Sequence, residues 1–136
     1  MVAKGGTVSI ADNTFIGAGS LIIARGKIEI GSDCLIAERV SIRDQNHRIC
    51  RSDVPFSRQG FSVAPIQIGN NVWIGAGAVV LEGVTIAGNS VAAANAVVTR
   101  DIQEWTVAAG IPARAIKTIQ IETTEIDSPI PARKSA

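Results

Sequence analysis

The sequence predicts an all-β solenoid whose coils have three flat sides. The first observation is a period of six: an aliphatic or small residue returns at every sixth position from Ile68 to Val98. The second is a compact side chain four residues after each of these anchors, from Val72 to Ile102. The third is composition, since 46% hydrophobic residues with 13 glycines and 4% aromatics suit a narrow prism filled by small side chains. A period of six fits neither a helix nor an alternating strand, but it fits stacked coils of about eighteen residues.

The repeat occupies two stretches of the chain. The N-terminal stretch has anchors at Ile10, Ile16 and Ile22, slips by two residues, and resumes with Ile30, Ile36 and Ile42. We expect residues 25–27 to absorb the slip as a widened corner. The C-terminal anchors are Ile68, Ile74, Val80, Ile86, Ala92 and Val98. Tight corners need residues that tolerate positive φ, and the asparagines expected at corners are Asn13, Asn70, Asn71, Asn89 and Asn95.

One segment between the two stretches has no period. From Arg43 to Pro65 the chain carries polar residues, several arginines and two prolines, and we predict an extended loop within residues 43–67. Long irregular loops on a rigid scaffold are often functional. The predicted organisation is a β-helix domain over residues 1–119 followed by a polar C-terminal tail, 120–136, that is at most partly ordered.

Charge and cysteine content exclude several classes of protein. A net charge of +1 gives no electrostatic basis for binding nucleic acid or an anionic membrane. No apolar run reaches the length of a membrane span, and the first residues lack a signal-peptide core, so we expect a cytoplasmic protein. Cys34 and Cys50 make no disulfide framework, and Cys34 falls at an inward position. The Val- and Ile-rich flat faces of such a small prism predict side-by-side association, most naturally as a threefold ring.

His47 is the only histidine of the chain. Neutral imidazole is the natural general base near neutral pH. A solvated loop histidine is the plain alternative, but the position of His47 at the one large interruption of the repeat favours a function. We expect no metal site, because zinc needs three or four ligands and one histidine with two distant cysteines does not supply them.

Three stretches resemble the hexapeptide-repeat acetyltransferases: IGNNVWIGAGAVVLEGVTIA at 68–87, VVTRD at 97–101 and VAAGIPARAIK at 107–117. The branch they are most similar to contains the galactoside and maltose O-acetyltransferases and the O-acetyltransferases of polysaccharide biosynthesis. The match covers roughly residues 7–119. The resemblance implies a left-handed parallel β-helix, a homotrimer, and acetyl-CoA bound between adjacent subunits.

The resemblance also implies roles for individual residues. His47 would be the catalytic base, the backbone N–H of Ala76 would donate to the oxyanion, and Ala94 would hold the pantetheine arm of the co-substrate. The residues implied at its nucleotide end are Thr99, Arg100, Arg114 and Lys117. Clustered arginine and lysine suit the phosphates of CoA, although a solvated charged edge is the alternative for each of them.

The acceptor site departs from the galactoside-type pattern. Where those enzymes place an acceptor-binding Asn and Asp, this chain has Gly17 and Arg25. Arg25 favours an acidic or phosphorylated acceptor, with a plain corner arginine as the alternative. Asp44 and Asn46 flank His47 and are predicted to orient its ring or bind acceptor hydroxyls.

The position of Arg58-Gln59-Gly60 is similar to a segment of the polysaccharide branch that borders the acceptor. Trp73 is expected to pack at a prism edge or subunit interface. Trp105 either stacks on adenine or caps the last coil.

The function predicted on these grounds is a CoA-dependent O-acetyltransferase that transfers acetyl to a saccharide hydroxyl, in surface polysaccharide biosynthesis. The alternatives are an amino-sugar N-acetyltransferase and a non-catalytic β-helix scaffold. The identity of the acceptor and the length of the acyl chain stay open.

Overall fold

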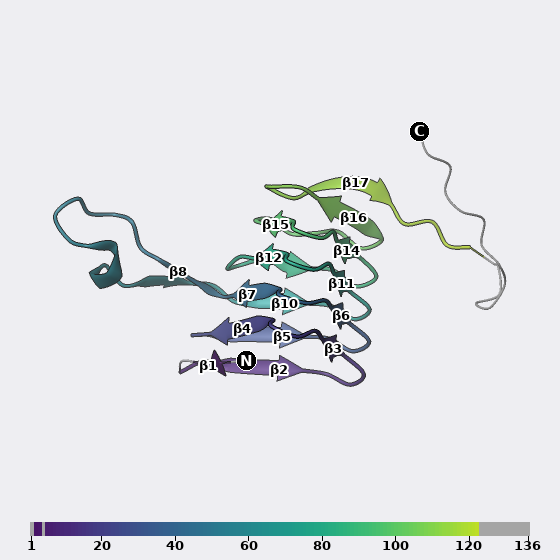
Figure 1. The fold of residues 1–136 in the computed structure, drawn as a ribbon, viewed down its shortest axis with the longest axis horizontal. Helices are drawn as coiled ribbons and strands as arrows, with labels where there is room; N and C mark the ends of the chain where they lie inside the picture. The colour runs from purple at the N-terminus through teal and green to yellow at the C-terminus, as the bar shows by residue number, and fades with distance from the viewer. Residues whose placement is uncertain (1, 4, 123–136) are drawn as a thin grey trace.

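The chain folds into a three-sided parallel β-helix, shown in Figure 1. The structure is a computed structural model that describes residues 2–3 and 5–122. Sheet A contains β1 (Val2–Ala3), β4 (Leu21–Ala24), β7 (Ser41–Arg43), β12 (Val79–Val80) and β15 (Val97–Val98). Sheet B contains β2 (Thr7–Ile10), β5 (Lys27–Ile30), β10 (Ile66–Ile68) and β13 (Thr85–Ile86).

Sheet C forms the third side of the prism. It contains β3 (Phe15–Ile16), β6 (Leu35–Ile36), β11 (Trp73–Ile74), β14 (Val91–Ala92), β16 (Thr106–Ala109) and β17 (Arg114–Thr118). Strand β17 pairs antiparallel with β16 and ends the stack. No helix of the part of the chain described here is long and apolar enough to cross a membrane.

The core follows the period of six. Strand pairing places Ile68 between Ile30 and Ile86, so anchors of successive coils lie above one another. All the anchors from Ile68 to Val98 and all the residues four positions after them are buried, which confirms the predicted inward set. Cys34 is fully buried and its Sγ lies 3.2 Å from the carbonyl oxygen of Gly69, as its inward position predicted.

The corners share one backbone conformation. A residue with positive φ lies three positions before each anchor from Ile16 onwards, except before Ile30 and Ile68. The non-glycine residues in this conformation are Asn13, Asp33, Arg39, Asn71, Asn89, Asn95 and Trp105. The expectation for asparagine corners is therefore confirmed at four of the five sites. At the fifth, Asn70 instead accepts the N–H of Ser32 through its side-chain oxygen at 2.8 Å.

The repeat slips at the corner between sheets A and B. Ile10 pairs with Ile30, whereas Ile68 pairs with Ile86, so the first coil is two residues longer than a regular one. The extra residues lie between β4 and β5, at Arg25-Gly26, which confirms the predicted widened corner.

The aperiodic segment leaves the prism from the same corner, one coil later. Arg43 ends β7 and Ile66 begins β10, so the excursion comprises residues 44–65. The predicted boundary at 67 is wrong because Ile66 and Gln67 already pair with β5 of sheet B. The excursion is a hairpin of β8 (Gln45–His47) and β9 (Phe61–Val63), with a 3₁₀ turn, η1 (Phe56–Arg58), near its tip.

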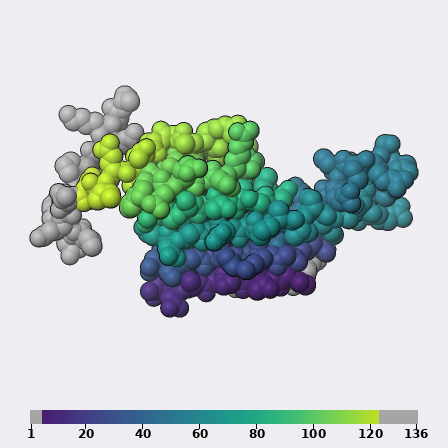
Figure 2. Space-filling model, turned by 180° about the vertical axis from the view of Figure 1, so that it is seen from behind, coloured from purple at the N-terminus to yellow at the C-terminus, as the bar shows by residue number. Residues whose placement is uncertain are grey.

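The hairpin projects well beyond the body of the prism, as Figures 1 and 2 show from opposite sides. At the other end of the long axis lie the exposed residues 120–122 that follow β17. The rest of the predicted tail, 123–136, lies outside the described residues.

Asp44 ties the root of the hairpin to the widened corner. It is fully buried, and its two carboxylate oxygens accept the backbone N–H groups of Arg25 and Gly26, each at 2.8 Å. The predicted binding of acceptor hydroxyls by Asp44 is therefore wrong, because the side chain is fully buried. Its hydrogen bonds go to the backbone of the corner, and none to His47 is found among the described residues. Asp44 is a structural clamp between two coils.

Replacing Asp44 with alanine should destabilise the fold. The change leaves two partly buried N–H donors unpaired and removes two hydrogen bonds to a carboxylate, and an unpaired donor away from water costs about 1–3 kcal/mol. We expect the free energy of unfolding in urea to fall by at least about 2 kcal/mol. Asp101→Ala is the matched control, because Asp101 also accepts a backbone N–H, that of Thr85 at 2.8 Å, but is exposed. Equal losses for the two variants would contradict the clamp.

Candidate active site

The hairpin holds His47 against an aromatic ring. His47 lies opposite Phe61 in the antiparallel ladder, and the two ring centroids are 4.6 Å apart with an angle of 35° between the planes. The backbone N–H of His47 donates to the side-chain oxygen of Asn46 at 3.1 Å. His47 itself is exposed. The imidazole is thus packed on one neighbour and accessible to a substrate.

Arg25 reaches the same aromatic ring from the widened corner. Its guanidinium carbon lies 3.6 Å from the centroid of the Phe61 ring, the geometry of a cation–π contact. Its Nε atom is buried and has no hydrogen-bond partner among the described residues. Arg25, Phe61 and His47 therefore form one contiguous group, although Arg25 and His47 come from successive coils.

A cavity of about 340 Å³ opens beside His47. Its lining residues are Asn46, His47, Arg48, Ile49, Cys50, Ser62 and Glu82. Sequence reasoning placed Asn46 and His47 here but missed Ser62 and Glu82. Glu82 follows anchor Val80 by two residues, as Asp44 follows Ile42, and these anchors pair in sheet A. From this register alone, Glu82 could have been predicted to lie one coil above Asp44, at the root of the hairpin.

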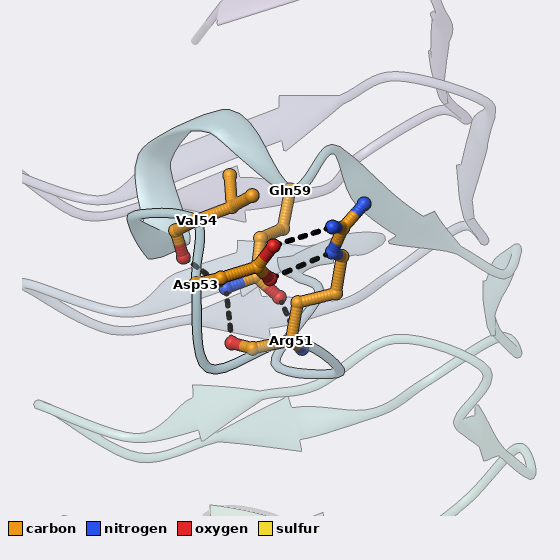
Figure 3. Close-up of polar contacts among 4 residues, drawn as sticks. All are labelled: Arg51, Asp53, Val54 and Gln59. Atoms are coloured by element: carbon orange, nitrogen blue, oxygen red, sulfur yellow. Dashed lines mark hydrogen bonds and ion pairs between the residues drawn. The ribbon is translucent and has the colours of Figure 1, made fainter.

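Gln59 braces the tip of the hairpin, as Figure 3 shows. Its side-chain oxygen accepts the N–H groups of Cys50 and Arg51 at 2.9 and 3.0 Å. Its side-chain nitrogen donates to the carbonyls of Arg51 and Val54 at 3.0 and 2.6 Å. The Arg51 guanidinium also pairs with Asp53 at 2.6 Å and lowers the pKa of that carboxyl. One amide side chain thus uses its whole hydrogen-bonding capacity to close the loop.

A second hollow, of about 520 Å³, lies along the outer face of sheet C. It is a mainly apolar groove that contains three of the predicted co-substrate residues, namely Ala76, Ala94 and Lys117. Neither Ala76 nor Ala94 donates its backbone N–H to another described residue. Trp73, 53% exposed, forms part of the groove wall, a placement that the sequence did not assign.

The other predicted co-substrate residues lie outside this groove. Thr99 and Arg100 follow β15 and are exposed, and Arg114 begins β17 and is exposed. Trp105 occupies the positive-φ corner of the last coil, where its carbonyl accepts the N–H of Ile119 at 2.7 Å. Gly17, which by sequence resemblance alone corresponds to an acceptor-binding position, packs so closely on Ala37 that an added Cβ would lie 2.6 Å from the Ala37 carbonyl carbon.

The groove and His47 lie on different sides of one chain. The hairpin leaves the corner between sheets A and B, which is opposite sheet C in a three-sided prism, and Figure 1 shows it projecting away from sheet C. A single chain therefore presents two separate half-sites. Within residues 2–3 and 5–122, no three His, Cys, Asp or Glu side chains come together as a metal-binding group.

Comparison with known proteins identifies both stretches of the repeat. Residues 65–100 match the family described as bacterial transferase hexapeptide (six repeats), and residues 7–38 match the hexapeptide repeat of succinyl-transferase. The galactoside O-acetyltransferase of Escherichia coli K12 is 37% identical over 115 residues, which is 85% of this chain and 56% of that protein.

Two solved structures share the fold. A galactoside acetyltransferase in complex with coenzyme A superimposes with a TM-score of 0.68 and 31% identity, covering 93% of this chain and 72% of that one. The polysialic acid-specific acetyltransferase NeuO gives a TM-score of 0.74 and 28% identity, covering 93% and 59%. The fold is accordingly the left-handed parallel β-helix. The chain spans 40–60% of the length of the first curated relatives that it matches.

Replacing Gln59 with alanine should loosen the hairpin tip without unfolding the prism. Each lost hydrogen bond contributes about 0.5–1.5 kcal/mol, so we expect the amide protons of Cys50 and Arg51 to exchange roughly tenfold faster. Residue-resolved hydrogen exchange by NMR would measure this. In the control, Arg51→Ala removes the ion pair but keeps the bonds of Gln59 to the backbone, and these two amides should stay protected. Unchanged exchange in Gln59→Ala would show that the brace is dispensable.

Proposed function

Because the chain belongs to the hexapeptide-repeat acetyltransferases, in the branch of the sugar O-acetyltransferases, we propose that it transfers an acetyl group from acetyl-CoA to a saccharide hydroxyl. The observation that carries the proposal is the placement of His47. The only histidine of the chain is packed on Phe61, accessible, and at the edge of a cavity large enough for a sugar ring.

In this proposal His47 is the general base. Its neutral imidazole accepts the proton of the acceptor hydroxyl while that oxygen attacks the thioester carbonyl. The carbon–sulfur bond then breaks, and the imidazolium returns the proton to the departing thiolate. Contact with Phe61, at 4.6 Å between ring centroids, limits the rotation of the imidazole.

The groove on sheet C is the proposed site for the acyl and pantetheine part of acetyl-CoA. The unpaired N–H of Ala76 suits an oxyanion donor, and the N–H of Ala94 suits the pantetheine amides. Lys117 lies at the same groove. Lys117 would bind the nucleotide phosphates together with Thr99, Arg100 and Arg114. These three residues lie outside the groove and would be supplied where two chains meet.

We propose a homotrimer, because sheet C carries an uncovered apolar ladder. Phe15, Leu35 and Trp73 stand in register on neighbouring strands and are 59%, 53% and 53% exposed. The outer face of sheet B is polar, with residues such as Glu29 and Gln67. Side-by-side packing through sheet C would cover the ladder and bring the hairpin of one chain to the groove of another, which unites the two half-sites.

Asn46 and Arg25 are the proposed acceptor-binding residues of the hairpin root. Asn46 lines the cavity with His47. Arg25 does not line the cavity, but it stacks on Phe61, the cross-strand partner of His47. We infer that the acceptor is a building block of a surface polysaccharide, since a polysialic acid-specific acetyltransferase is among the structural relatives.

Replacing His47 with alanine should abolish transfer but leave CoA binding intact. Loss of a general base lowers the rate by about 10²- to 10⁴-fold. Free-thiol release from acetyl-CoA would be followed across a panel of sugars and nucleotide sugars, with calorimetry for CoA. Phe56→Ala is the control and should keep transfer, because Phe56 is on the same hairpin and 62% exposed but does not line the cavity. If CoA does not bind to the wild type, the scaffold alternative replaces the enzyme.

Replacing Leu35 with glutamate should dissociate the assembly. A charge buried in an apolar interface is costly, so light scattering after gel filtration should give three times the chain mass of 14.2 kDa for the wild type and one chain mass for the variant. Gln67→Glu, on the exposed face of sheet B, should stay assembled. A monomeric wild type, or an unchanged mass for Leu35→Glu, would disprove this interface.

A further inference from the structure

Resting on the proposed transfer to a saccharide, we propose that the acceptor carries an anionic group, a carboxylate or a phosphate, and that Arg25 binds this group beside His47. The inference starts from the contacts of Arg25 and not from the identity of any known acceptor. Its three supports are a fixed backbone, a short separation from His47, and a guanidinium that forms no ion pair with a described residue.

The backbone of Arg25 is fixed by the buried carboxylate of Asp44. The N–H groups of Arg25 and Gly26 donate to its two oxygens, each at 2.8 Å. The corner itself exists because the first coil is two residues longer than a regular coil. Arg25 is therefore presented by a rigid part of the prism, although it lies in a corner.

The side chain of Arg25 is directed to the catalytic hairpin. Its guanidinium carbon lies 3.6 Å from the centre of the Phe61 ring, and the His47 ring lies 4.6 Å from the same centre. The guanidinium is consequently at most about 8 Å from the imidazole, the combined length of these two separations. One sugar residue bridges such a distance, with its acidic group at Arg25 and its hydroxyl at His47.

The positive charge of Arg25 is not consumed by an ion pair. The two ion pairs found within the described residues join Lys27 to Glu29 and Arg51 to Asp53. Asp44 is close by, but both its oxygens are bound by backbone N–H groups. The Nε atom is buried, so the edge left to a ligand is the one formed by the two terminal nitrogens. That edge matches the two oxygens of a carboxylate or phosphate.

The other charges near His47 define the orientation of the acceptor. Arg48 and Glu82 line the cavity beside His47. Arg25 lies between β4 and β5, and Glu82 lies between β12 and β13, so they flank the hairpin root from different coils. An anionic group is repelled by Glu82 and attracted by Arg25, whereas the neutral hydroxyls of the same sugar can donate to the Glu82 carboxylate. These charges thus favour one orientation of an acidic saccharide, with its anionic group toward Arg25 and its hydroxyls toward Glu82.

The binding test uses the single histidine as a reporter. Because the chain contains one histidine, the imidazole nitrogens of ¹⁵N-labelled protein give one set of NMR signals. Glucuronate, glucose 6-phosphate and glucose would be titrated separately into the assembled protein. We expect saturable shifts of the His47 signals with an anionic sugar and none with glucose at the same concentration. The uronate and phosphate arms distinguish the two possible anions.

The variants identify the residue that binds the anion. Arg25→Gln should weaken binding of the anionic sugar about 10- to 100-fold, the effect of losing a hydrogen bond to a charged group. Arg25→Lys should keep part of the binding, because it retains the charge but not the planar fork. Arg51→Gln is the control and should bind as the wild type does, because Arg51 is exposed at the hairpin tip and its guanidinium pairs with Asp53.

The outcomes separate this inference from the proposed function. Shifts as large with glucose as with the anionic sugars, no shift with either anionic sugar, or unchanged binding in Arg25→Gln would each overturn the inference. Acetylation of neutral sugars that depends on His47 would leave the transferase standing without an anionic preference. Anion binding at Arg25 without CoA binding or transfer would support the anion site but contradict the proposed acetyltransferase function.

Discussion

The register of inward side chains between coils is the constraint on which the rest of the structure depends. Each coil donates backbone N–H groups to the carbonyls of a neighbour, as Gly75 does to Ala92 at 2.8 Å, and buries the same column of small aliphatic residues. A one-residue change within a side would turn inward side chains outward. Extra residues are therefore tolerated only at corners, where they leave the stack and return to the same column.

Both departures from the repeat use the corner between sheets A and B, and this shared location brings the residues of the candidate site together. The two-residue slip presents Arg25, and the excursion one coil above presents His47 and Phe61. Asp44, the first residue of the excursion, accepts the backbone N–H groups of the widened corner at Arg25 and Gly26. A buried carboxylate is stable only when it is hydrogen-bonded, so the fold couples the conformation of the corner to that of the hairpin.

The sequence predicts the core and the corners because a period of six is local information. It predicts His47 as a candidate because the histidine is unique and interrupts that period. The stacking of Arg25 on Phe61 joins residues from different coils, and the role of Asp44 depends on the side to which its carboxylate turns. The same holds for Gln59, whose position resembles a segment bordering the acceptor but whose amide closes the hairpin tip. Such contacts are set by three-dimensional packing, which a linear period does not contain.

Bracing at both ends of the hairpin has a reason in the proposed chemistry. A catalytic base must be held close to its productive position, because small displacements of a reacting group lower the rate strongly. A projecting hairpin is otherwise among the least stable parts of a fold. Asp44 anchors its root, Gln59 closes its tip, and Phe61 packs on the imidazole between them. These contacts would let a segment outside the prism meet the groove of a neighbouring chain with the precision of a residue inside it.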